Sequence, residues 1–150
     1  MNKEKRSLPK SFWWSAGSLI LMVVGAFGPW AKVADLLTIN GTDGGRDGWA
    51  VVGAAAVAAL VLLLFLRFRR GWLVVLSLLA GLAGAATAAY DISDINGIAS
   101  DDELFGSLVS TEWGIYLALV GSISLSLASI GLLIEGRRRE PRPVETPVGV

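Results

Sequence analysis

The chain has 150 residues and contains no cysteine and no histidine. Without cysteine it can form no disulfide and carry out no thiol redox chemistry. Without either residue type, zinc or haem held by His or Cys ligands is excluded, and so is general-base catalysis by an imidazole. The 13 basic residues balance the 13 acidic ones, so no net positive charge attracts the chain to nucleic acid. We therefore expect no bound cofactor and no nucleic-acid partner.

Charged residues are scarce, at 17% of the chain, whereas hydrophobic residues reach 53%. Four hydrophobic runs contain no charged residue, and each has at least the roughly 18 residues that a helix needs to cross a bilayer. The runs are apolar on all sides and lack the polar stripe of a helix in a soluble bundle. The sequence thus predicts an all-α fold, an integral membrane four-helix bundle. The predicted spans are residues 11–31, 49–66, 72–90 and 113–134.

The segments at the two ends of the chain are polar. Residues 1–10 form a basic segment, and residues 135–150 are charged and then proline-rich, which predicts a disordered tail. The first run is longer than the apolar region of about 7 to 15 residues in a signal peptide, so we expect it to remain as an uncleaved span. The Gly28–Pro29 pair should end this helix where it leaves the membrane.

The basic residues predict the orientation. Four lie in the N-terminal segment, three in the link between the second and third spans, and four in the tail. Most of the acidic residues lie in the two other loops, 32–48 and 91–112. Because Lys and Arg favour the cytoplasmic side, both termini should be cytoplasmic in a multi-pass protein of the cell (inner or plasma) membrane.

The six tryptophans lie at the ends of the predicted spans. An indole prefers the interface between membrane and water, so they should form two belts. The predicted inner belt is Trp13, Trp14 and Trp72, and the predicted outer belt is Trp30, Trp49 and Trp113.

Small residues recur about every four positions in the third and fourth spans. This spacing lets helix backbones approach closely, and serine hydroxyls can bond across helices. The stripes either pack the four helices against one another, or the one on the fourth span receives a helix of another protein. Ser124 lies off this stripe and would serve as a lipid-facing control. The candidate helix-interface residues are Gly81, Gly84, Ala88, Ala118, Ser122, Ser126 and Ser129.

The first outer loop, 32–48, is rich in glycine. Asp43 and Asp47 beside glycines are compatible with calcium, but a solvated turn between two spans explains them more simply.

The second outer loop, 91–112, partly matches a calcium-binding loop. Asp94, Asn96 and Glu103 occupy ligand positions, but Ile92 stands at the first position and cannot ligate, so we expect no EF-hand. Ser100 as an N-cap and Glu103 closing a capping box instead predict the start of a helix that lies along the membrane surface or over the bundle mouth.

Three short motifs carry a resemblance. Pro29–Trp30 closes the first span, Asp47–Gly48–Trp49 ends the first loop, and Gly114–Ile115–Tyr116 opens the last span. In these motifs the chain resembles small, mostly uncharacterised four-span membrane proteins common in actinobacteria. Claudin-type proteins share the four-span layout, but their Trp and paired-Cys signature is missing, so their function is not carried over.

The predicted spans contain no Asp, Glu, Lys, Arg or His, which argues against ion-coupled transport and proton relay. The acidic residues outside the spans form no recognisable catalytic motif, so we do not expect an enzyme. The leading hypothesis is an accessory or scaffold protein that binds another envelope membrane protein through its helices and outer loops. The alternative is an oligomeric channel or facilitator for a small or lipophilic solute. The expected partners are the lipid bilayer and either a membrane protein or further copies of the chain.

Overall fold

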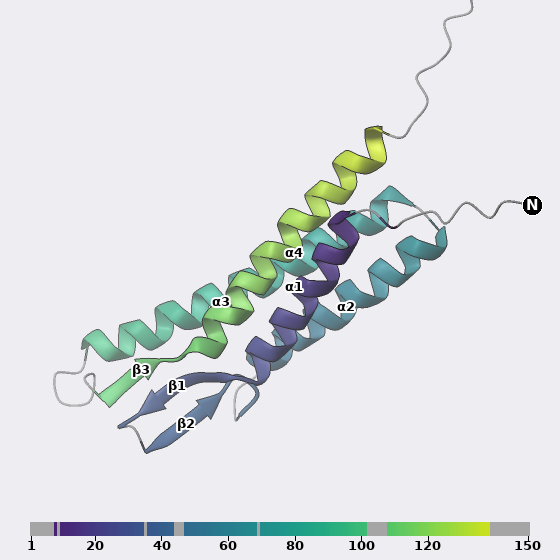
Figure 1. Ribbon diagram of the computed structural model, residues 1–150. Helices are drawn as coiled ribbons and strands as arrows, with labels where there is room; N and C mark the ends of the chain where they lie inside the picture. Colours follow the sequence, from purple (N-terminus) through teal and green to yellow (C-terminus); the bar gives the residue numbers. More distant parts are fainter. Residues whose placement is uncertain are drawn as a thin grey trace, which may run out of the picture.

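The computed structural model describes residues 8, 10–34, 36–43, 47–68, 70–101 and 108–138, with the backbone alone for 98–101, 137 and 138. In this part of the chain, four helices and three short strands follow one another in the order α1-β1-β2-α2-α3-β3-α4 (Figure 1). The helices are α1 (Lys10–Phe27), α2 (Asp47–Phe68), α3 (Gly71–Asp101) and α4 (Trp113–Arg138). The strands are β1 (Pro29–Val33), β2 (Leu37–Asn40) and β3 (Val109–Thr111).

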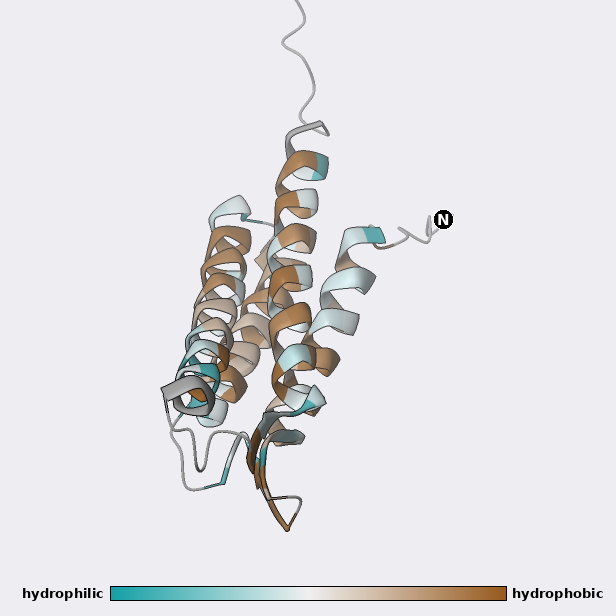
Figure 2. Ribbon diagram, turned by 90° about the vertical axis from the view of Figure 1, so that its left-hand side faces the viewer, coloured by the Kyte–Doolittle hydropathy of each residue, from teal (hydrophilic) through white to brown (hydrophobic). Residues whose placement is uncertain are grey.

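All four helices are long and apolar enough to cross a membrane. Hydrophobic colours dominate along the helices in Figure 2, except in the first turns of α1, which are pale, and hydrophilic colours gather near the helix ends. The prediction of four helices of spanning length is confirmed, and such a set of helices is typical of a multi-pass membrane protein. The structure extends α4 to Arg138, four residues beyond the predicted last span.

The helices pack as a bundle in which α4 contacts both α1 and α3, and α2 contacts α1 and α3. Its centre is filled by completely buried side chains, among them Met22, Ile115 and Leu125. Glycines let α1 and α4 approach closely: a Cβ atom on Gly121 would lie 2.7 Å from the backbone nitrogen of Met22. The close packing of this bundle therefore depends on positions without a side chain.

A three-stranded antiparallel sheet, in the order β2-β1-β3, lies at one end of the bundle (Figure 1). We call this the sheet end; α1 begins and α4 ends at the opposite end. The sheet joins the two loops, because Lys32 on β1 is opposite Thr38 on β2 and Ser110 on β3.

The predicted helical bundle is present, with three short strands that the sequence analysis did not predict. The strands correct the bounds of one span: the first predicted span, 11–31, is too long because α1 ends at Phe27 and Pro29 starts β1. The Gly28–Pro29 pair ends the helix as predicted. Hydropathy missed the strand because β1 is also largely apolar and directly continues the hydrophobic run of α1.

The length of helix α3 corrects the prediction for the second outer loop, 91–112. It continues to Asp101, well past the predicted end of the third span at residue 90. Ser100 therefore lies inside a helix and is not an N-cap, while Glu103 and the helix predicted after it lie outside the described residues. Charged residues end a hydrophobic run but need not end a helix. At 31 residues, α3 is roughly 45 Å long, more than the hydrocarbon core of about 30 Å requires.

Candidate functional site

The stripe of small residues lies inside the chain's own bundle. Gly81 and Gly84 of α3 face Ser126 and Ser122 of α4: added Cβ atoms would lie 2.6 and 2.7 Å from the serine Oγ atoms. All seven predicted interface residues are buried. The structure thus packs Ser122 and Ser126 of the α4 stripe against α3 and Ala118 against Gly25 of α1, which leaves no room on the stripe for a helix of another protein.

The serine hydroxyls of this interface are satisfied within the chain. Ser122 and Ser126 donate to carbonyl oxygens one turn earlier in α4, at 2.8 and 3.0 Å, and Ser129 donates to the Ser77 hydroxyl of α3 at 3.2 Å. A buried hydroxyl without such a partner would be destabilising. These serines are therefore structural residues of the bundle.

Ser124 does not face lipid, which corrects its assignment as a control. Its Oγ accepts a hydrogen bond of 2.6 Å from the indole nitrogen of Trp14 and lies 3.0 Å from the Ser18 hydroxyl, both on α1. A helical wheel separates the faces of α4 but cannot tell which face meets which neighbour. Ser124 therefore belongs to the contact between α1 and α4.

Trp30 is the exception among the tryptophans. The other five are exposed, whereas Trp30 is only 6% exposed, and its indole nitrogen donates to the Gly25 carbonyl at 2.9 Å. Gly41 packs directly on this indole, without room for a Cβ atom. The predicted place of Trp30 in an outer belt is wrong, because its ring connects β1 to the end of α1.

A cleft of about 170 Å³ opens beside Trp30 at the sheet end. The β1–β2 hairpin and the turn that follows it form one part of the cleft. The start of α2 and residues 91–95 of α3 form the rest. Its lining combines apolar side chains with four aspartates: Trp30, Ile39, Asn40, Gly41, Asp43, Asp47, Asp91, Asp94 and Ile95.

Two glycines bring the turn after β2 against the start of α2. The Gly48 backbone nitrogen donates to the Gly41 carbonyl at 3.1 Å, and Gly41 in turn donates to the Gly28 carbonyl at 3.2 Å. A Cβ atom on Gly48 would overlap the Gly41 backbone. This close contact places Asp47, the first residue of α2, next to the hairpin. A carboxylate at a helix N-terminus is also favoured by the helix dipole.

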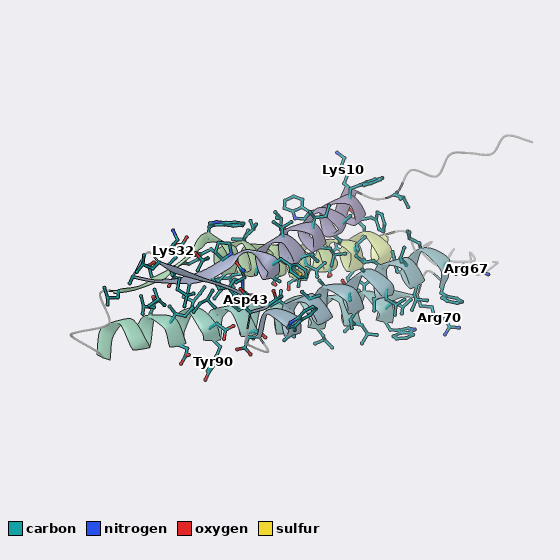
Figure 3. All side chains as sticks on the ribbon, turned by 90° about the horizontal axis from the view of Figure 1, so that it is seen from below. Lys10, Lys32, Asp43, Arg67, Arg70 and Tyr90 are labelled. Atoms are coloured by element: carbon teal, nitrogen blue, oxygen red, sulfur yellow. The ribbon has the colours of Figure 1, made fainter. Side chains whose placement is uncertain are left out.

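Asp43 is held by its own turn. Its Oδ2 accepts hydrogen bonds from the backbone nitrogen and the side-chain amide of Asn40, at 3.1 and 2.7 Å. In Figure 3 Asp43 lies where the hairpin meets the helices, at the same end as Lys32. On the other wall of the cleft, Asp91 and Asp94 lie on one face of α3 because they are three residues apart.

Asp91 is the most buried of the four aspartates, with 9% of its surface exposed. Its Oδ2 accepts no hydrogen bond from a donor group among the described residues; the Asp91 side chain instead meets the carboxyl group of Asp47 within hydrogen-bonding reach, and the Asp94 carboxylate also acts on it. The other such buried oxygen in the described chain is Oε2 of Glu135, whose second oxygen accepts from Ser11. A buried carboxyl group with an unpaired oxygen and like charges nearby is unfavourable.

Basic side chains in the described part of the chain do not neutralise the cleft. Lys32 is paired with Glu112 at 3.7 Å, and neither lines the cleft. Lys10, Arg67 and Arg70 lie toward the opposite end of the bundle (Figure 3). The cleft is therefore a concentration of negative charge.

The residues of the calcium-loop pattern are not arranged as a loop. Asp94 and Asn96 lie in helix α3, and the Asn96 side chain accepts a hydrogen bond from Thr111 at 3.3 Å. The described residues contain no group of three or more acidic, His or Cys side chains spaced to hold a metal ion.

Sequence reasoning missed Asp91 as a site residue and did not connect it with Asp47. The available signal was that both residues directly border an apolar run, at what topology predicts to be the same end of the bundle. Comparisons of the chain with protein-family models, with curated proteins and with solved structures gave no match.

Proposed function

We propose that the protein is an accessory or scaffold protein of the plasma membrane that binds another membrane protein of the envelope at its sheet end. Both termini are cytoplasmic in this proposal, and the sheet lies outside the cell. The placement of Lys10, Arg67 and Arg70 toward the end opposite the sheet supports this orientation (Figure 3), because basic residues favour the cytoplasmic side.

The observation that carries the proposal is the exposed hairpin. Leu36 is 92% exposed and Leu37 is 59% exposed, and Ile39 on the same edge strand is exposed as well. In the described sheet β2 pairs with β1 on one side, and no strand pairs with its other side. An apolar edge strand is a template for the addition of a strand from another chain.

The packing inside the bundle limits the surfaces that a partner protein could contact. The small-residue stripes of α3 and α4 are already used within the chain, so a partner would meet the outward-facing helix sides or the sheet end. The alternative function, a channel, would need several copies, because Met22, Ile115 and Leu125 fill the centre of one bundle.

Co-purification in mild detergent followed by mass spectrometry tests the proposal. We expect a reproducible membrane-protein partner with the wild-type chain and loss of that partner with Leu37→Lys, since a lysine on an edge strand opposes strand addition. Phe68→Lys is the matched control, an equally exposed apolar residue at the opposite end of the bundle. Retention of the partner by Leu37→Lys, or a homogeneous homo-oligomer with no partner, would contradict the proposal.

The orientation is tested separately with single cysteines, since the chain has none of its own. On cells without an outer barrier, a membrane-impermeant maleimide should label cysteines at Thr42 and Ser110 and not those at Ser7 and Thr146. Labelling at Ser7 or Thr146 would reverse the orientation.

A further inference from the structure

We propose that the aspartate-lined cleft at the sheet end is a binding site for an organic cation that carries a primary ammonium group. The ammonium would lie against Asp91, between the hairpin and α3. Free amines and the lysine side chain of a protein partner share this chemistry.

The first reason is the state of Asp91. It is nine-tenths buried, it lines the cleft, and its Oδ2 accepts no hydrogen bond from a donor group among the residues that the structure describes; the side chain that it meets is the like-charged carboxyl group of Asp47. Buried carboxyl groups are normally paired, because removing one from water without compensation is unfavourable. A cationic donor in the cleft would offset the repulsion between the Asp91 and Asp47 carboxylates.

The second reason is the charge around Asp91. Asp43, Asp47 and Asp94 line the same cleft, and its described lining contains no Lys or Arg. The field of four carboxyl groups therefore favours a positive ligand and disfavours an anion. Lys32, the basic residue of β1, is already paired with Glu112.

The third reason separates an organic cation from a metal ion. Calcium needs six to eight oxygens at about 2.3–2.6 Å, and the described acidic residues are not grouped closely enough for that. An ammonium group instead uses three separate donors with longer bonds of about 2.7–2.9 Å to each oxygen. Aspartates that come from three different segments suit this looser arrangement.

The fourth reason is the apolar part of the lining. Trp30 of β1, Ile39 of β2 and Ile95 of α3 all line the cleft. A short alkyl stem attached to the ammonium would contact these residues and be removed from water. The volume of about 170 Å³ is several times the share of one water molecule, about 30 Å³, and so admits a short alkylamine.

The test uses the full chain in lipid nanodiscs, titrated with n-butylammonium chloride by calorimetry. We expect saturable binding at one site, weakened at least about tenfold by Asp91→Asn. Glu112→Gln is the matched control, because Glu112 is an acidic residue of the same end that does not line the cleft. It should bind like the wild type.

Two further probes identify the chemistry. Tetramethylammonium has the same charge but no N–H donor, so it should bind at least about tenfold more weakly than butylammonium. Calcium should not compete at equal concentration. Calcium binding tighter than butylammonium binding would overturn the proposal in favour of a metal site.

An Arg46→Gln variant is titrated in parallel, because Arg46 precedes Asp47 in the sequence and lies outside the described residues. The site is supported if the wild type or the Arg46→Gln variant binds butylammonium and loses this binding when Asp91→Asn is added. Absence of binding by both proteins at millimolar concentration overturns it.

Co-purification of Asp91→Asn then separates the two sources. If Asp91→Asn loses both the protein partner and butylammonium binding, the natural ligand is a lysine side chain of the partner. If Asp91→Asn loses butylammonium binding but keeps the partner, the natural ligand is a free amine. The free-amine site stands on the cleft alone, whereas the lysine source rests on the proposed function. A failure of the proposed function would be seen with Leu37→Lys, which leaves the cleft aspartates in place and should still bind butylammonium.

Discussion

Buried polar groups differ in their hydrogen bonding between two regions of the molecule, the α3–α4 interface and the cleft at the sheet end. In the interface, the hydroxyls of Ser122, Ser126 and Ser129 all bond to groups of the same chain. In the cleft, Asp91 is comparably buried, but one of its oxygens accepts no hydrogen bond from a donor group in the described structure, and its side chain meets the carboxyl group of Asp47 instead. The serine hydroxyls of the bundle are therefore paired within the fold, whereas the Asp91 carboxyl group faces a group of like charge.

The largest effect is expected where packing leaves no space. A Cβ atom on Gly25 would overlap the backbone of Ala118 on α4, whereas one on Gly53 would meet nothing within 4 Å. Gly25→Ala should lower the free energy of unfolding by about 3 kcal/mol, and Gly53→Ala should leave it equal or raise it by about 0.5 kcal/mol. Thermal unfolding in detergent measures both. Equal melting temperatures would show that α1 and α4 are not in close contact.

The next effect tests the α4 serines. Ser122→Leu places bulk against Gly84 and should destabilise the isolated protein by roughly 1 to 3 kcal/mol. Ser124→Leu should also destabilise it, since it removes the acceptor for Trp14. Ile130→Leu, at an exposed position of the same helix, is the control. A Ser122→Leu protein that melts like the wild type would mean that α3 does not cover this face.

A smaller change, of opposite sign, is expected in the cleft. Without added amine, Asp91→Asn removes a buried charge near two other carboxylates and should raise stability by about 1 kcal/mol. Asp94→Asn, at an exposed position, should change the melting temperature less. Destabilisation by Asp91→Asn would show that this carboxyl group has a structural partner after all, and the contrast with the bundle would disappear.

The smallest effect concerns the ion pair between Lys32 and Glu112. The two side chains are 3.7 Å apart and partly exposed, so water and salt screen their attraction. Lys32→Gln should therefore change stability by no more than about 0.5 kcal/mol. A larger loss in chemical denaturation would mean that the sheet contributes more to stability than its exposure indicates.

The helices could be predicted from the sequence because a long uncharged run has few alternatives to a membrane span. The sheet could not be, since β1 continues the apolar run of α1 and its partner β3 is a separate, short segment. Trp30 was misplaced for the same reason: as a strand residue beside a helix end, it points into the fold. The orientation and the proposed partner remain predictions.

The cleft was hidden by the distances between its parts along the chain. Asp43 and Asp47 come from the first loop, and Asp91 and Asp94 come from the extension of α3. Each pair alone is typical of a solvated loop. Only the turn closed by Gly41 and Gly48, together with the length of α3, brings the two pairs to one site.

The order of the sheet has a consequence for biosynthesis. β1 leaves the ribosome before α2 and α3, yet it pairs with β3, which follows them. Contacts so distant in sequence form late, after the intervening segments have been made. The hairpin can form early, but β1 must wait for β3 until α3 is complete. The sheet is therefore completed only after α3 has been made, and an altered or shortened α3 would leave the edge of β1 open in the nascent protein.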